Sequence, residues 1–176
     1  KYLDRRKPGQ SKYTTQRKEG DQVEILSGVF EGKTTGTPIS MVVYNKDQRS
    51  KDYSNIKDVY RPGHADFTFD MKYGFRDYRG GGRSSGRETI GRVAAGAVAA
   101  KVLEELEISV KAYAKAIAGI KISEDRFDLN EMNNNPFNMP DKEAADLVAK
   151  KADQMIKEQD SIGGIIECQI TGMPVG

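Results

Sequence analysis

The order of apolar and polar residues predicts a strand in each of four stretches of the chain. Three are short: residues 22–31, where Gly28 interrupts the pattern, residues 39–44 and residues 165–170. The fourth runs from 110 to 122, with apolar residues at its even positions and Lys111, Lys115 and Lys121 between them. This longer stretch predicts a strand with one face in water.

Two stretches have helical spacing instead. Ser85 and Glu88 stand at the spacing of a capping box, and a run rich in alanine and glycine follows to Leu106. Its small residues allow close approach from several directions, so we expect a core helix that is buried on more than one side. Residues 145–159 repeat apolar side chains at the period of an amphipathic helix.

Two further segments lack periodicity. Residues 1–20 form a basic, polar stretch that reads as a loop, and residues 45–82 are dense in aromatic, glycine and charged residues. An irregular stretch of that length is usually functional or disordered. Because we find no repeat and no clear linker, we expect residues 1–176 to form a single domain of mixed strands and helices.

Composition then excludes several classes of protein. Lys and Arg number 28 against 26 Asp and Glu, a net charge of +2, too balanced for bulk electrostatic binding of nucleic acid. No window approaches the roughly 18 apolar residues of a membrane span. Cys168, expected in the core, is the single cysteine and His64 the single histidine, so neither a disulfide nor a thiolate metal site forms within the chain. We expect no metal and a reducing, cytoplasmic setting.

The strongest candidate for chemistry is the run Gly80-Gly81-Gly82-Arg83-Ser84-Ser85 before the capped helix. Bare amides, two hydroxyls and an arginine at the positive end of a helix dipole suit an anion. Arg87 lies one turn beyond Arg83, so both guanidinium groups could reach one phosphate or carboxylate. Two alternatives stay open: a simple connection with solvated arginines, or an Arg/Gly stretch that binds RNA.

His64 follows Pro62 and Gly63 in a loop, which favours an exposed side chain. As the single histidine it is the candidate for acid–base work, although a lone loop histidine is more often only hydrogen-bonded. Aromatic residues of the same region, Tyr73, Phe75 and Tyr78, could stack on a planar ring or pack the loop.

These residues together resemble the chorismate synthase family. The resemblance runs through 61–66, 79–89 and 92–97, and extends to 4–9, 13–17, 25–32, 45–50 and 160–164. It implies a β-α-β sandwich with helices packed between antiparallel sheets, of which this chain holds an incomplete part. The implied reaction is the anti 1,4-elimination of phosphate from 5-enolpyruvylshikimate 3-phosphate, giving chorismate with the help of reduced FMN.

The resemblance also implies roles for individual residues. Arg83, Ser84 and Ser85 match the segment that contacts FMN, and His64 matches a histidine that protonates reduced flavin. The positions matched to binding of the substrate or NADP are Arg6, Lys12, Arg61 and Arg87, with Lys12 standing where many members carry arginine. Family members form homotetramers, and their flavin is reduced either by their own NADPH-dependent activity or by a separate reductase.

The resemblance covers roughly the first half of a family member without its start, where the second active-site histidine belongs. We therefore expect truncation at both ends of the chain, and little or no activity from these 176 residues alone.

Overall fold

The computed structural model describes residues 2–15, 20–45 and 56–175. Their contacts form two compact units: one comprises Lys1–Gly9 and Gln16–Val98, the other Gln10–Thr15 and Ala99–Gly176. The expectation of a single domain over residues 1–176 stays a prediction.

The first unit begins with two pairs of short antiparallel strands. β1 (Val23–Ser27) pairs with β4 (Ser40–Val43), and β2 (Val29–Phe30) pairs with β3 (Lys33–Thr34). Gly28 separates β1 from β2 with φ at +82°, and a Cβ there would lie 2.7 Å from the Pro38 carbonyl oxygen. The predicted interruption of this strand at Gly28 is confirmed, because a side chain would collide with the neighbouring backbone.

Two helices follow along the chain, and the second of them begins in the first unit and ends in the other. α1 (Asp66–Tyr73) lies inside the segment for which the sequence predicted no element, and it ends at Gly74 with φ at +77°. α2 (Thr89–Glu105) is the predicted helix after the glycine run, preceded by the 3₁₀ turns η2 (Gly82–Ser84) and η3 (Gly86–Glu88).

The expectation that α2 is buried on more than one side is wrong for this structure. Ala94 is its single fully buried residue among the described residues. A Cβ at Gly91 or Gly96 would meet no atom within 4 Å among the described residues, so no other segment packs closely against these two positions. The small residues permit close packing, but they do not by themselves supply a partner.

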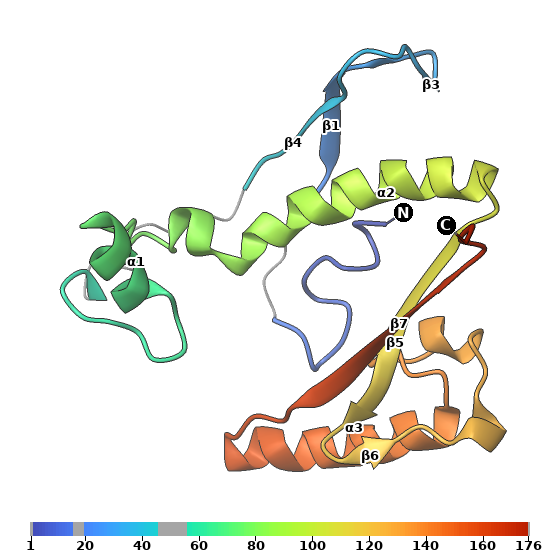
Figure 1. Cartoon of the computed structure of the whole chain (residues 1–176). Coiled ribbons are helices and arrows are strands. Elements are labelled where there is room, and N and C mark those ends of the chain that lie inside the picture. The colour runs from blue at the N-terminus through green and yellow to red at the C-terminus, as the bar shows by residue number, and fades with distance from the viewer. Residues whose placement is uncertain (1, 16–19, 46–55, 176) are drawn as a thin grey trace. The chain divides into compact units, whose positions relative to one another are not determined.

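The second unit is built on a three-stranded antiparallel sheet in the order β6-β5-β7, whose long strands cross the centre of Figure 1. β5 (Ser109–Ile117) and β7 (Gly164–Thr171) pair along their length, with a bulge at Lys115. The predicted strand over 110–122 does not run straight through: Ala118 and Gly119 have φ at +52° and +79° and turn the chain into β6 (Ile120–Lys121). Two consecutive positive φ values are typical of a tight hairpin turn.

α3 (Lys142–Glu158) supplies the core of this unit and confirms the predicted amphipathic helix. Its buried residues pack with β5 and with the preceding loop, in a cluster made of Ala114, Met139, Ala144, Ala145 and Val148. Asp141 caps the helix, because its carboxylate accepts from the Ala144 amide over 3.1 Å. The loop before it contains the turns η4 (Glu124–Arg126) and η5 (Glu131–Asn133).

Cys168 is exposed, which contradicts its predicted place in the core. It lies on β7, an edge strand of the sheet, opposite Ala112. Ile166 and Ile170, on the same side of β7, are also more than half exposed, at 70% and 57%. α3 covers only part of the sheet, so strand periodicity alone did not predict burial here.

Candidate anion-binding site

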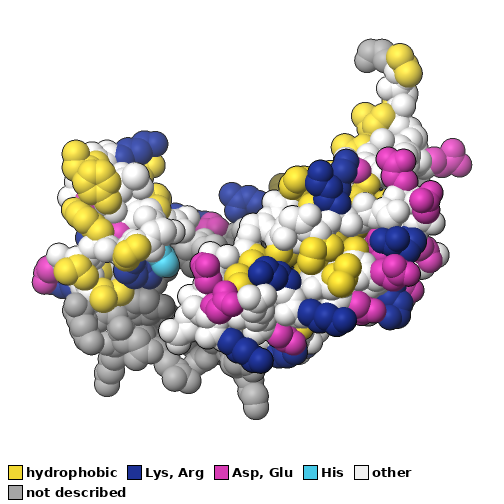
Figure 2. All heavy atoms as spheres, turned by 90° about the horizontal axis from the view of Figure 1, so that it is seen from below, with side chains coloured by type: hydrophobic (Ala, Val, Ile, Leu, Met, Phe, Trp, Pro, Cys, Tyr) yellow, Lys and Arg dark blue, Asp and Glu magenta, His cyan; other side chains and the backbone are white. Residues whose placement is uncertain are grey.

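A tight turn joins Arg61 to His64 ahead of α1. The His64 amide donates to the Arg61 carbonyl over 3.3 Å, and Gly63 has φ at +71°. His64 Nδ1 lies 3.0 Å from the Pro62 carbonyl oxygen. Because a carbonyl oxygen only accepts, this contact puts a proton on Nδ1 and leaves Nε2 as the acceptor of the neutral ring. The side chain is exposed, as predicted, and the histidine colour is visible at the surface in Figure 2.

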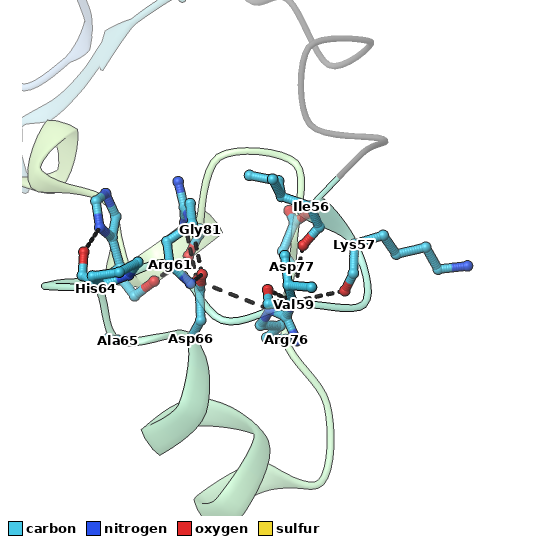
Figure 3. A network of polar contacts seen from close by, with 12 residues as sticks. Ile56, Lys57, Val59, Arg61, His64, Ala65, Asp66, Arg76, Asp77 and Gly81 are labelled. Atoms are coloured by element: carbon cyan, nitrogen blue, oxygen red, sulfur yellow. Dashed lines mark hydrogen bonds and ion pairs between the residues drawn. The ribbon is translucent and has the colours of Figure 1, made fainter.

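Asp66 holds Arg61 through three hydrogen bonds, drawn in Figure 3. Arg61 donates to the Asp66 carboxylate from its backbone amide over 3.1 Å, from Nε over 2.9 Å and from Nη2 over 3.0 Å. The hydrogen bonds from the Arg61 side chain hold the pKa of Asp66 far below its ordinary value, although burial opposes them. Asp66 is therefore a carboxylate at neutral pH.

Arg76 lies beside this pair and ties the preceding loop to α1. Nη1 donates to Asp70 over 2.6 Å, and Nη2 lies 3.3, 2.7 and 2.8 Å from the carbonyl oxygens of Ile56, Lys57 and Val59. The side chain is 10% exposed. A buried guanidinium that bonds in this way fixes the backbone on either side of it, so Arg76 has a structural role.

The glycine run forms a compact turn instead of an open loop. Gly80, Gly81 and Gly82 have φ at +109°, +91° and +51°, values that favour glycine. The Ser84 hydroxyl donates to the Gly81 carbonyl over 2.7 Å, which closes the turn. A flexible Arg/Gly segment of the RNA-binding kind has no such fixed hydrogen bonds.

Arg61 lies against this turn, as Figure 3 shows for Arg61 and Gly81. A Cβ at Gly81 would be 3.8 Å from Arg61 Nη2 and 2.9 Å from the Ser84 hydroxyl oxygen. The structure thus brings Arg61 next to Gly81 and Ser84, which follow it by 20 and 23 residues in the sequence. A fixed guanidinium beside bare backbone and a hydroxyl is an arrangement suited to an anion.

The capping box at Ser85 forms only in part. The Ser85 hydroxyl oxygen accepts from the Arg87 amide over 3.3 Å, but Glu88 accepts from Arg83 Nη1 over 2.9 Å instead of reaching back to Ser85. The Ser85 amide donates to the Gly82 carbonyl, so it needs no second acceptor. The 3₁₀ turns before α2 therefore replace the predicted reciprocal cap.

Arg83 and Arg87 do not converge in this structure. Arg83 is 88% exposed in its ion pair with Glu88, whereas Arg87 is 26% exposed and lies 2.8 Å from Asp21. Exposed ion pairs contribute little to stability, so Arg83 can exchange Glu88 for an anionic ligand at small cost. A site that uses both residues requires Arg83 to turn.

The remaining basic candidates lie elsewhere. Arg6 donates from Nη1 to the Tyr2 carbonyl over 2.9 Å. Lys12 belongs to the second unit, where Nζ lies 2.7 Å from Asp153 and 5.0 Å from the centre of the Tyr13 ring. The hydrogen bond to Asp153 raises the pKa of Lys12, which therefore keeps its charge.

The described residues contain no group of three or more His, Cys, Asp and Glu side chains that could hold a metal ion. Among the same residues no helix is both long and apolar enough to cross a membrane.

Comparison with known proteins decides the family. The family model for chorismate synthase matches residues 1–176, the whole chain. The chain belongs to the chorismate synthase family. Curated chorismate synthases from Lachnospira eligens and Agathobacter rectalis are 70% and 64% identical to it over 174 and 175 residues, and the match covers 99% of this chain and 48% of each of them. The chain thus spans about half the length of these relatives.

A solved structure of a chorismate synthase matches the fold with a TM-score of 0.65 at 28% identity, over 84% of this chain and 43% of that one. The α+β class with antiparallel sheets and helices, predicted from the resemblance, is confirmed. The match spans both compact units.

Sequence reasoning did not single out two residues that shape the turn at Arg61. Asp66 and Arg76 organise the turn at Arg61, and neither was a candidate. A signal for Asp66 existed: an acidic residue in the first turn of a helix whose last turn carries Lys72 and which ends at Gly74. For Arg76 the sequence offers no comparable signal, because its partners are backbone carbonyls.

Proposed function

We propose that this chain carries part of a chorismate synthase active site. The proposed reaction is the elimination of phosphate from 5-enolpyruvylshikimate 3-phosphate to give chorismate. One observation carries it: Arg61 is held against the Gly81 turn, within a chain that matches the family over its whole length. Arg61 and the turn come from sequence segments that the resemblance singled out independently.

The proposed substrate carries a phosphate and two carboxylates, so its recognition needs several cationic donors. Arg61 supplies a guanidinium whose direction is set, and Arg83 supplies one that can change partner. We assign substrate contacts to Arg6, Arg61 and Arg87, with Lys12 as a point charge without the arginine fork. Arg87 donates from Nη2 to Asp21 in this structure.

The turn from Gly80 to Ser85 fits the phosphate or ring edge of a flavin. Its left-handed glycines present backbone without side chains, and the Ser85 oxygen accepts from Arg87 while its own proton is left to donate. Arg83 adds an exposed charge. When bound, reduced FMN supplies its chemistry to a reaction in which the substrate undergoes no net oxidation.

His64 is the proposed acid–base residue. Its Nδ1 proton is engaged by the Pro62 carbonyl, so Nε2 is the atom that gains or loses a proton. The Pro62 contact also fixes the ring, since rotation about its bonds would break that hydrogen bond. An exposed, oriented imidazole is what proton exchange at neutral pH requires.

Several broader features belong to the same proposal. The protein acts in the cytoplasm as a homotetramer, with flavin reduced by its own NADPH-dependent activity or by a separate reductase. RNA binding through the Arg/Gly stretch is not favoured, because that stretch is folded into 3₁₀ turns.

The test uses a chain of the relatives' full length that contains these residues. The parent should release phosphate from 5-enolpyruvylshikimate 3-phosphate in the presence of reduced FMN. His64→Ala should lower kcat by about 100-fold or more, because a positioned acid–base group typically contributes that much. Lys72→Ala, an exposed residue of α1, is the control and should stay within about twofold of the parent on the usual scale of surface changes.

The outcomes separate the claims. A parent that releases no phosphate would contradict the reaction. A His64→Ala protein within a few-fold of an active parent would contradict the proton role alone.

A further inference from the structure

The Asp66 side chain is buried, with 4% of its surface exposed. Among the described residues its carboxylate accepts three hydrogen bonds, all from Arg61. One of them comes from the Arg61 backbone amide, and two come from its guanidinium. A carboxylate that binds both the backbone and the side-chain end of one arginine fixes the whole length of that side chain. The contact therefore sets a direction as well as neutralising a charge.

The surroundings hold Asp66 in turn. It is the first residue of α1, where the helix dipole favours negative charge. Arg76 Nε lies 3.9 Å from Asp66 Oδ1. Arg76 is itself anchored by Asp70 and by the loop carbonyls. Asp66 thus lies between two arginines, with Arg76 on one side and Arg61 on the other (Figure 3).

The guanidinium that Asp66 fixes is the one beside the glycine turn. Nη2 of Arg61 donates to Asp66 Oδ1 over 3.0 Å, and the same atom would lie 3.8 Å from a Cβ placed at Gly81. A change of Arg61 rotamer would break its bonds to Asp66 and withdraw it from the turn. Asp66 therefore controls whether Arg61 faces this turn.

We propose that Asp66 is a positioning residue, which holds the Arg61 guanidinium against the Gly81 turn so that Arg61 meets an anionic group of the substrate. The inference rests on the proposed function, in which Arg61 binds the substrate. It adds that the affinity contributed by Arg61 depends on a residue that does not itself touch the substrate.

The test is a double-mutant cycle in the full-length protein, with KM for 5-enolpyruvylshikimate 3-phosphate, kcat and FMN affinity as readouts. Asp66→Asn keeps the size but removes the charge and one acceptor. It should raise KM by about 10-fold, with a smaller change in kcat and FMN affinity unchanged, as expected when uniform substrate binding is lost. In an Arg61→Ala background the same substitution should change KM by less than about twofold, because coupled residues are not additive.

Asp146→Asn is the matched control. It makes the same carboxylate-to-amide change at an exposed residue of α3 that pairs with Lys142 and contacts neither Arg61 nor Arg76. It should leave KM within about twofold of the parent, on the usual scale of surface changes. If Asp66→Asn does not fold, Asp66→Glu retains the charge, displaces the guanidinium and should raise KM in the same way.

Three results would overturn the inference while the parent is active. They are an unchanged KM in the Asp66 variant, a KM effect that multiplies with that of Arg61→Ala, and an equal KM effect in Asp146→Asn. A parent without turnover would instead contradict the proposed function, and this inference with it.

Discussion

Substitution of Gly81 by alanine tests whether the glycine turn binds flavin. Gly81 has φ at +91°, and its new Cβ would lie 2.9 Å from the Ser84 hydroxyl oxygen. Gly74 at the end of α1 is a matched control, because its φ is +77° but a Cβ there would meet nothing within 4 Å. Both changes introduce the same backbone strain, and only Gly81→Ala crowds the turn.

The expected magnitudes follow from these contacts. A left-handed conformation costs alanine about 1 kcal/mol more than glycine. At Gly81 the Ser84 hydroxyl must also move, which loses its 2.7 Å bond to the Gly81 carbonyl. Loss of that bond adds about 1 kcal/mol, for a total of about 2 kcal/mol. If the turn relaxes to relieve this cost, flavin binding must restore it, so Kd should rise about 30-fold.

The assay is titration of the full-length protein with FMN, followed by flavin fluorescence, beside thermal unfolding of both variants. Gly74→Ala should lose about 1 kcal/mol of stability and keep its FMN affinity within about twofold. Equal FMN affinity in the parent and in Gly81→Ala would refute the placement of flavin at this turn. A comparable loss in Gly74→Ala would show that general destabilisation, and not crowding at Ser84, weakens binding.

Three further predictions concern the second unit. Asp141→Ala should cost about 3 kcal/mol in urea unfolding, because the helix cap and the partner of the half-buried Ser123 amide are both lost. Asp146→Ala on the exposed face should cost under about 0.5 kcal/mol. Burial opposes the charged form of Asp141, but hydrogen bonds from Arg126 and two amides outweigh it and lower the pKa of Asp141. Its contribution to the free energy of unfolding is therefore complete above the ordinary pKa of 3.8 and is lost as the pH falls below that value. A parent whose stability falls no faster in acid than that of Asp141→Ala would contradict this. Val148→Ala should cost about 2 kcal/mol against under about 0.5 kcal/mol for the half-exposed Leu147→Ala, and equal losses would contradict the assigned core. The hydrogen bond to Glu167 raises the pKa of Tyr113 to about 12, so an ultraviolet titration should show one tyrosine that ionises late and that disappears in Tyr113→Phe.

Local chemistry explains which elements the sequence predicted. The strand break at Gly28, the start of α2 after the glycine run and the amphipathic α3 all depend on residues that are close in sequence. α1 was missed because its apolar residues include Phe67 and Met71, which are 53% and 71% exposed, so no buried stripe marks the helix. The hairpin at Gly119 was missed because the alternation of residues continues on both sides of the turn.

By itself the sequence determined the family, the α+β class and the identity of most candidate site residues, because these reside in motifs and periodicities that a linear chain displays. The roles of those site residues stay predictions. Only the tertiary structure decided which of them meet: Arg61 at the Gly81 turn, Arg83 with Glu88, and Lys12 in the other unit with Asp153. Ion pairs and close approaches of this kind depend on where the backbone folds back on itself, and sequence spacing does not record that.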